Sequence, residues 1–114
     1  MGKLKVVVLI SGRGSNLKAI INKCSKKNVL AKVIGIISNN SNASGLKLTG
    51  DFKKIIIDNK LSKKIFETEL QNNLEKLKPD LICLAGFMKI LSPFITKKWK
   101  NKIINVHPSL LPSF

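Results

Sequence analysis

An asparagine and a histidine lie two residues apart near the end of the chain, in the segment Asn105-Val106-His107-Pro108. They follow a short apolar run, so we expect a β-strand that ends near Asn105. Because side chains alternate along a strand, Asn105 and His107 then point to the same side. An amide donor beside an imidazolium can stabilise a developing oxyanion, and the same histidine can carry a proton. The alternative is that both side chains satisfy loop carbonyls and have no catalytic role.

A second candidate segment is the glycine-containing turn at residues 11–14, which separates an apolar run from a helical pattern. The unpaired N–H groups in the first turn of such a helix form an anion site. We expect a phosphate monoester there, held by the backbone of Gly14, Ser15 and Asn16. Leu17 stands where the dinucleotide motif has its third glycine, and the P-loop spacing does not occur, so NAD is not indicated. The alternative is that the turn only joins a strand to a helix.

The elements that must position these segments can be read from the hydrophobic pattern. The expected strands cover residues 6–10, 33–37, 55–57, 81–85 and 103–106. The expected helices run from Ser15 to Cys24, from an N-cap at Ser62 to a stop at Pro79, and from Ser92-Pro93 toward Trp99. Strands that alternate with helices predict an α/β fold with a doubly wound, mostly parallel sheet. Ligands of such sheets bind beyond the carboxyl ends of the strands, where both candidate segments lie.

The charge of the chain is strongly positive, at +15 for 114 residues. Arg13 is the only arginine among 21 cations, and the lysines are spread along the chain without aromatic residues between them. This pattern is typical of solvated helix faces and not of base recognition, so we expect no nucleic-acid partner.

The remaining composition argues for an ordinary cytoplasmic domain. Cys24 and Cys83 are far apart and His107 is the only histidine, so we expect neither a disulfide framework nor a metal site. Both cysteines fit small buried positions. No apolar run reaches the roughly 18 residues that a membrane span requires, so we expect no membrane contact.

Three segments together resemble signatures of the phosphoribosylglycinamide formyltransferase family. They are VLISGRGSNL at residues 8–17, LAGFMKIL at 84–91 and NVHPSLLP at 105–112, in the order and spacing of that family. The resemblance spans the whole chain and implies the Rossmann-like formyltransferase fold. It also implies a step of purine biosynthesis, in which the amine of glycinamide ribonucleotide attacks the formyl carbon of the co-substrate 10-formyltetrahydrofolate.

The resemblance assigns a role to individual residues. It implies that Gly14, Ser15 and Asn16 hold the substrate phosphate and that Asn105 and His107 form the catalytic pair. It implies that the folate is contacted by Lys63, Met88, Lys89, Ile90, Leu91 and Asn105.

The sequence departs from the family pattern in two ways. Lys63 and Lys89 stand where the family usually has arginine, so a point charge replaces a two-pronged donor. The family also has an aspartate that raises the pKa of the catalytic histidine, whereas the last acidic residue here is Asp80, at the start of a strand and so at the wrong edge. We therefore expect residues 1–114 to be the N-terminal part of a single formyltransferase domain, a truncated fragment that is inactive alone.

Other functions remain open at this point. Methionyl-tRNA formyltransferase and formyltetrahydrofolate deformylase share similar residues around Asn105 and His107, but the loop at residues 12–16 and Pro108 argue against both. A catalytically silent, phosphate-binding α/β module is the alternative from a different class, and a formyl-transfer assay separates it from an enzyme.

Overall fold

The structure is a computed structural model that describes residues 3–12, 15–24, 26, 30–43, 46 and 52–106. These residues form five strands and three helices, in the order β1 (Leu4–Ile10), α1 (Ser15–Cys24), β2 (Ala31–Ser38), β3 (Lys54–Ile56), α2 (Lys63–Leu77), β4 (Leu81–Ala85), α3 (Pro93–Lys98) and β5 (Ile103–Val106). Within this part of the chain, no helix is long and apolar enough to cross a membrane.

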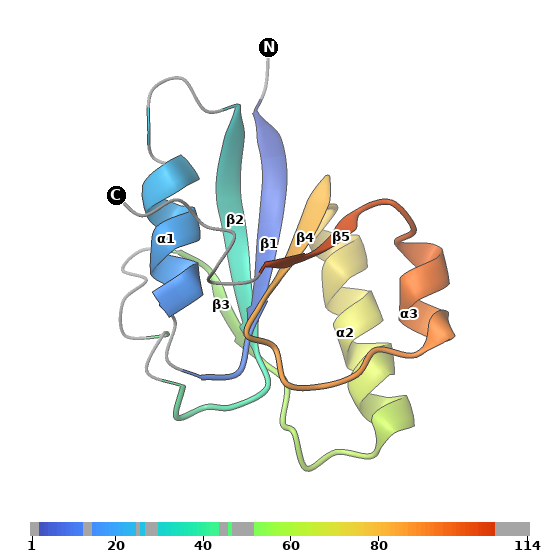
Figure 1. Cartoon of the computed structure of the whole chain (residues 1–114). Helices are drawn as coiled ribbons and strands as arrows, with labels where there is room; N and C mark the ends of the chain where they lie inside the picture. Colours follow the sequence, from blue (N-terminus) through green and yellow to red (C-terminus); the bar gives the residue numbers. More distant parts are fainter. Residues whose placement is uncertain are drawn as a thin grey trace.

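The strands form one parallel sheet in the order β3-β2-β1-β4-β5. Helix α1 covers one face, and helices α2 and α3 cover the other (Figure 1). The chain winds outward from β1 in both directions, so the order reverses between β1 and β4. The predicted doubly wound α/β fold is therefore confirmed, and the crevice at the carboxyl ends of β1 and β4 is the expected ligand position.

Strand β1 is central because its side chains are apolar on both faces. Val6, Val8 and Ile10 pack in the core under α1, whereas Val7 and Leu9 pack in the core under α2 and α3. All five side chains are at most 3% exposed. A continuous apolar run, in place of an alternating one, is what a strand covered on both faces requires.

Helix α2 begins and ends at the predicted signals. The Ser62 hydroxyl accepts a hydrogen bond from the Ile65 N–H at 3.3 Å. At the other end, Lys78 adopts the left-handed conformation with φ at 50°, and its N–H donates to the Leu74 carbonyl. Pro79 then follows and cannot continue the helix.

Three details differ from the sequence-based prediction. Strand β1 begins at Leu4 and β2 at Ala31, two residues earlier than expected, because the exposed residues at these ends still pair across the sheet. Strand β3 ends at Ile56, although the Ile57 N–H still donates to the Ser38 carbonyl. Ser92 occupies the N-cap of α3 as predicted, with Pro93 next, but its hydroxyl makes no capping bond. That hydroxyl donates to the Glu67 carboxyl.

The two cysteines belong to the core under α1 and are both free. Cys83 is buried and Cys24 is half-buried. Burial raises the pKa of both thiols above 9.0, and for Cys83 the neighbouring Cys24 adds to the rise. Both therefore remain neutral thiols near neutral pH and act as small apolar side chains.

Candidate active site

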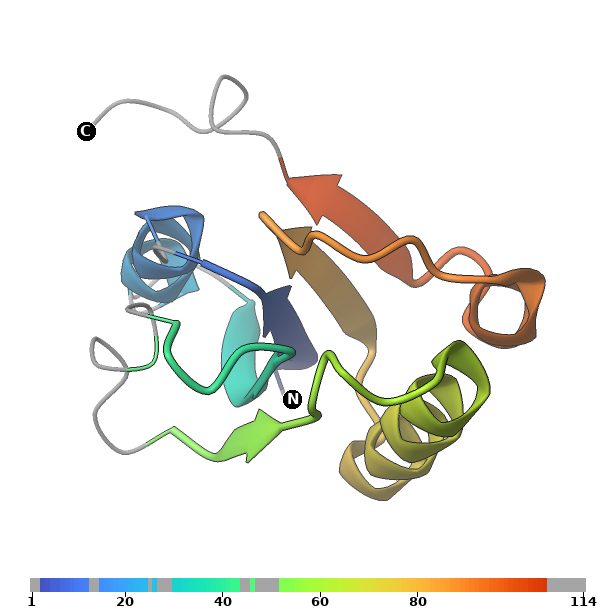
Figure 2. The same ribbon diagram turned by 90° about the horizontal axis from the view of Figure 1, so that it is seen from below.

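Loops from four strands meet at the carboxyl edge of the sheet, which Figure 2 views from below. They enclose a cavity of about 590 Å³. Its lining residues are Ser11 after β1, residues 39–42 after β2, residues 58–60 after β3 and Met88 after β4. Asparagine amides and serine hydroxyls supply both donors and acceptors, so the cavity suits a polar ligand.

Ser11 joins the loop after β1 to the loop after β4. Its hydroxyl accepts a hydrogen bond from the Met88 N–H at 2.8 Å, although the two residues are 77 positions apart. Its carbonyl accepts a longer bond, 3.3 Å, from the Asn40 side chain. Helix α1 begins directly beyond this loop, at Ser15, as predicted. Gly14 and the side chains of Ser15 and Asn16 lie outside the described residues.

The loop after β4, residues 86–92, presents alternate side chains to the core and to solvent. Gly86 turns the chain with φ at +70°. Phe87 and Leu91 then pack against the core under α2 and α3, and the Phe87 ring lies 6.4 Å from the ring of Phe66. Met88 and Ile90 are 85% and 83% exposed. Two apolar side chains held open to water beside a polar cavity form a surface that a flat apolar ring could cover.

Two lysines predicted to bind folate lie on different parts of this edge. The Lys89 ammonium donates to the Asn59 side chain at 3.4 Å and lies 4.6 Å from the centroid of the Phe66 ring. Lys63 is the first residue of α2 and lines a separate hollow of about 420 Å³, which also touches Glu67, Ser92 and Phe94. Lys89 does not line this hollow, so the two lysines do not share it.

Asn105 is exposed in the edge strand β5, opposite Leu84 of β4. Its neighbour Ile103 packs against the core under α2 and α3, whereas Val106 packs against the core under α1. By alternation, Asn105 faces the same side as Ile103, which is also the side of residues 86–92. His107 lies outside the described residues, so its predicted pairing with Asn105 stays a prediction.

The acidic residues are distributed as the sequence indicated. Asp80 lies at the amino edge, where its carboxyl accepts a hydrogen bond from the Lys5 N–H at 2.8 Å. Asp58 lies at the carboxyl edge but follows β3, at the far side of the sheet from β5, and caps the Lys60 N–H. Neither of these two aspartates therefore lies at the carboxyl end of β5, beside Asn105. Among the described residues, no cluster of three acidic, cysteine or histidine side chains forms a metal site.

Comparison with known proteins identifies the family. The family model described as formyl transferase matches residues 4–114. The chain belongs to the formyl transferase family. It is similar to the trifunctional purine biosynthetic protein adenosine-3 of Gallus gallus, with 45% identity over 98% of this chain and 12% of the relative. It is also similar to the phosphoribosylglycinamide formyltransferase of Escherichia coli, with 37% identity over 97% of this chain and 54% of the relative.

A solved structure supports the formyl transferase fold. The crystal structure of phosphoribosylglycinamide formyltransferase from Brucella melitensis superposes with a TM-score of 0.89 at 35% identity. It covers 98% of this chain and 60% of the crystallised one. The chain thus spans little more than half the length of its single-function relatives.

Sequence reasoning missed Glu67 of this formyl transferase chain, which borders the candidate site. Glu67 is buried in α2 and holds Ser92, at the end of the loop after β4. The signal was present, because helical spacing places Glu67 on the same face as the buried Leu70 and Leu74. An acidic residue in a buried stripe needs a polar partner.

Proposed function

We propose that this chain forms part of a phosphoribosylglycinamide formyltransferase, which moves a formyl group from 10-formyltetrahydrofolate to the amine of glycinamide ribonucleotide. Residues 1–114 would form the N-terminal part of a single formyltransferase domain. The observation that carries the proposal is the 2.8 Å hydrogen bond between the Met88 N–H and the Ser11 hydroxyl. It joins the loop suited to a phosphate to the loop suited to a folate.

The nucleotide side of the proposed site is the start of α1. The backbone N–H groups of Gly14, Ser15 and Asn16 would bind the phosphate, because the first turn of a helix has unpaired donors and a partial positive charge. The polar cavity beside Ser11 gives the rest of the nucleotide hydrogen-bonding partners.

The folate side is the loop after β4. The exposed side chains of Met88 and Ile90 would cover a flat ring, and Leu91 supports them from the core. Lys63 and Lys89 provide positive charge for the carboxylates of the folate, with Asn105 on the same face of the sheet. The ammonium group of lysine cannot form the two parallel hydrogen bonds that a planar guanidinium makes to a carboxylate. We therefore expect weaker folate binding than arginine would give.

The proposed reaction needs an oxyanion donor and a proton carrier. The amine nitrogen forms a bond to the formyl carbon, and the carbonyl oxygen becomes an oxyanion in the tetrahedral intermediate. The Asn105 amide would donate to that oxygen. His107 would transfer a proton from the attacking amine to the folate nitrogen as the bond between carbon and that nitrogen breaks.

Calorimetric titration of the chain with glycinamide ribonucleotide tests the nucleotide site. Gly14→Val should weaken binding at least about tenfold, or roughly 1.4 kcal/mol, because its side chain obstructs the helix start. The matched control is Gly12→Ala, since a Cβ at Gly12 meets no atom within 4 Å. Equal affinities for a folded Gly14→Val variant and the wild type would remove the loop from the site.

A formyl-transfer assay tests the chemistry. We expect no turnover from the 114 residues alone, because the described aspartates, Asp58 and Asp80, both lie away from the carboxyl end of β5 and cannot favour a charged histidine there. In an active protein that contains this chain, His107→Ala should lower the rate about a hundredfold and leave nucleotide affinity within about twofold. A rate loss below about threefold would give His107 a structural role.

A further inference from the structure

Glu67 is an acidic side chain almost wholly removed from water, with 5% of its surface exposed. It lies in α2 between the buried residues Phe66 and Leu70. Among the described residues Glu67 takes part in no ion pair. By contrast, Glu75, two turns further along α2, pairs with Lys98. A buried carboxyl group without a cation is costly unless hydrogen bonds satisfy it.

Both carboxyl oxygens of Glu67 bind the same residue. Oε2 accepts a hydrogen bond from the Ser92 N–H at 2.7 Å, and Oε1 accepts one from the Ser92 hydroxyl. The Ser92 hydroxyl makes no capping bond at the start of α3, so its bond to Glu67 anchors the side chain. The two bonds fix both the position and the orientation of Ser92, since a single bond would leave it free to rotate.

Ser92 is the last residue of the loop after β4. The start of that loop is fixed by the bond from the Met88 N–H to Ser11, and its middle by the bond from Lys89 to Asn59. Met88 and Ile90 nevertheless stay more than four-fifths exposed, so burial of their own side chains does not hold them in place. Their positions depend on the bonds at the two ends of the loop and on the packing of Phe87 and Leu91 against the core.

We propose that Glu67 is a positioning residue for folate binding, which acts through Ser92 to hold Met88, Ile90 and Leu91 in the geometry that receives the ligand. This inference rests on the folate-binding role proposed above for residues 88–91. Glu67 itself need not touch the folate. A ligand that meets a loop already held at both ends avoids the entropy cost of ordering it.

The test compares variants of the full chain in two measurements. Glu67→Gln keeps the side-chain shape but replaces one charged acceptor oxygen with an NH₂ donor. The Ser92 hydroxyl would then have to turn from donor to acceptor, and both bonds would lose the charge of the acceptor. Ser92→Ala removes only the hydroxyl bond. Glu69→Gln is the matched control, because Glu69 is an exposed acidic residue of the same helix.

The first measurement is calorimetry with 5-formyltetrahydrofolate and, separately, with glycinamide ribonucleotide. Glu67→Gln should weaken folate binding about tenfold and Ser92→Ala about threefold, with nucleotide affinity within about twofold for both. Glu69→Gln should match the wild type. If both affinities fall together, in proportion to a loss of thermal stability, Glu67 has only a structural role and the inference is overturned.

The second measurement is the NMR spectrum of backbone amides without ligand. In Glu67→Gln the signals of residues 88–92 should shift or broaden, while those of β1 and β4 stay in place. Unchanged loop signals would overturn the inference even if folate binding changed. A wild-type chain that does not bind the folate would contradict the proposed function, whereas the amide signals would still decide whether Glu67 positions the loop.

Discussion

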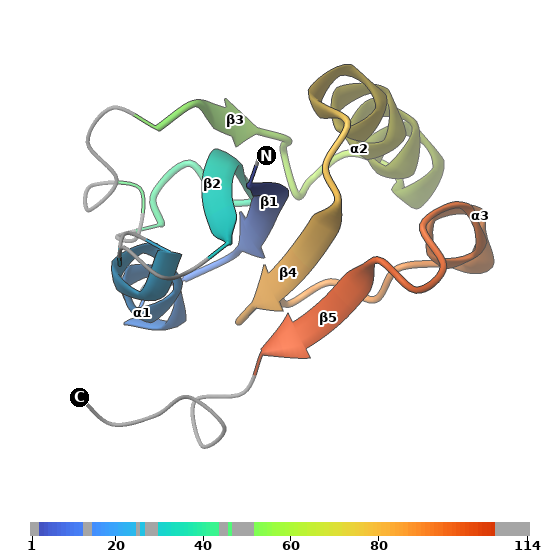
Figure 3. The ribbon, with the colours of Figure 1, turned by 90° about the horizontal axis from the view of Figure 1, so that it is seen from above.

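Two polar contacts join helix α2 to the segment that follows β4. One contact holds the loop after β4, and the other holds the end of α3. One turn apart on the same helix face, Glu67 binds Ser92 and Gln71 binds Trp99. Helices α2 and α3 lie side by side on one face of the sheet (Figure 3). The first contact ends on a loop with exposed apolar side chains, and the second ends on a buried indole. A single helix face thus serves both a candidate binding site and a core.

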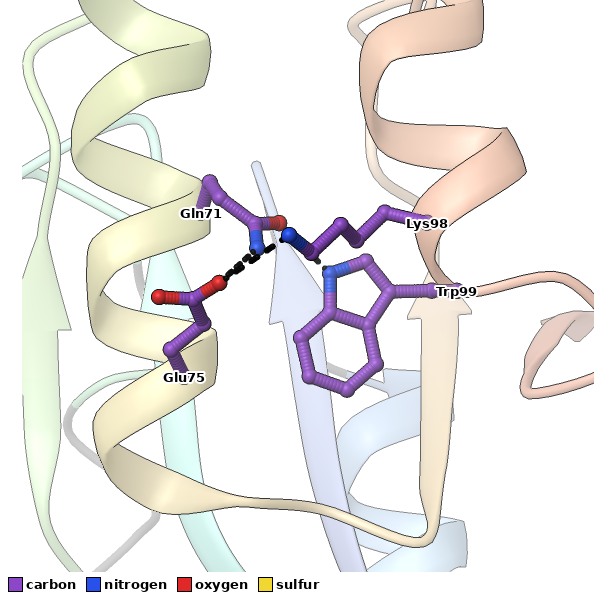
Figure 4. A network of polar contacts seen from close by, with 4 residues as sticks. All are labelled: Gln71, Glu75, Lys98 and Trp99. Atoms are coloured by element: carbon purple, nitrogen blue, oxygen red, sulfur yellow. Dashed lines mark hydrogen bonds and ion pairs between the residues drawn. The ribbon is translucent and has the colours of Figure 1, made fainter.

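The second contact is a chain of four side chains, which Figure 4 shows. The Trp99 indole N–H donates to the Gln71 carbonyl oxygen at 2.7 Å, and the Gln71 amide donates to the Glu75 carboxyl at 2.7 Å. The Lys98 ammonium lies 3.4 Å from the same carboxyl oxygen. The contact passes from buried groups at Trp99 and Gln71 to exposed groups at Glu75 and Lys98. Its energy should therefore be concentrated at the buried end.

Removal of the indole should give the largest effect. Trp99→Ala deletes a side chain that is 8% exposed and leaves the Gln71 carbonyl without its partner. We expect a loss of about 3–5 kcal/mol in the free energy of unfolding, measured by urea denaturation. The control Lys100→Ala, at an exposed neighbouring position, should change it by less than about 0.5 kcal/mol. A loss of under about 1 kcal/mol in Trp99→Ala would show that the indole is not part of the core.

Replacement of the amide should have a smaller effect and should separate the two contacts. Gln71→Met keeps the volume but leaves the buried Trp99 N–H without an acceptor, at a cost of about 1–3 kcal/mol. Folate affinity should stay within about twofold of the wild type, unlike in Glu67→Gln. A tenfold loss of folate affinity in a folded Gln71→Met variant would mean that both contacts position the loop. Asn72→Ala, on the exposed side of α2, is the control.

A substitution at Gly86, the first residue of the loop after β4, tests the same loop at the end opposite Ser92. Gly86 has φ at +70°, and a Cβ there meets no atom within 4 Å, so Gly86→Ala imposes only backbone strain. We expect a loss of about 1 kcal/mol in the free energy of unfolding. Folate affinity should fall as well, because the strain acts on the loop. Thermal denaturation and calorimetry measure the two effects, and a loss of stability with unchanged folate affinity would contradict the role given to this loop.

The smallest effect is a pH dependence at the exposed end of the second contact. The hydrogen bond from Gln71, then the bond and charge of Lys98, lower the pKa of Glu75 below 4.5. Because the pKa of Glu75 is lower in the folded state than in the unfolded state, the charged carboxyl stabilises the fold at neutral pH. This stabilisation is lost as the pH falls below 4.5 and through the pKa of the folded state. Glu75→Gln should therefore be slightly less stable than the wild type at pH 7 and equal to it in strong acid. Denaturation curves across this range would show no pH-dependent difference between the two proteins if the bonds do not form.

The sequence predicted the fold well where a single local signal decides the structure. The apolar runs in β1 and β4 are buried on both faces, and α2 lies between the predicted signals Ser62 and Pro79. Strand ends that carry exposed lysines were missed, because pairing across the sheet extends them beyond their apolar residues.

The candidate site was predicted in part for a similar reason. The motif at residues 84–91 identified the loop after β4, but a sequence motif does not reveal contacts made by distant residues. Neither the bond from Met88 to Ser11 nor the bonds from Ser92 to Glu67 follow from local spacing. Ser92 shows the limit most clearly, since its predicted position at the N-cap is confirmed but the bond of its hydroxyl to Glu67 could not be predicted from it.

The central place of β1 has a consequence for how the protein comes to be folded. This strand leaves the ribosome before the other described elements, yet one of its two neighbours, β4, follows only after α1, β2, β3 and α2. Parallel pairing across such a separation closes a long loop, which slows folding relative to a helical chain of the same size. Ser11 cannot reach Met88 before that step, so the two loops meet late. In a partly synthesised chain the loop after β1 is therefore present before the loop after β4, and the bond between them can form only after β4 has paired with β1.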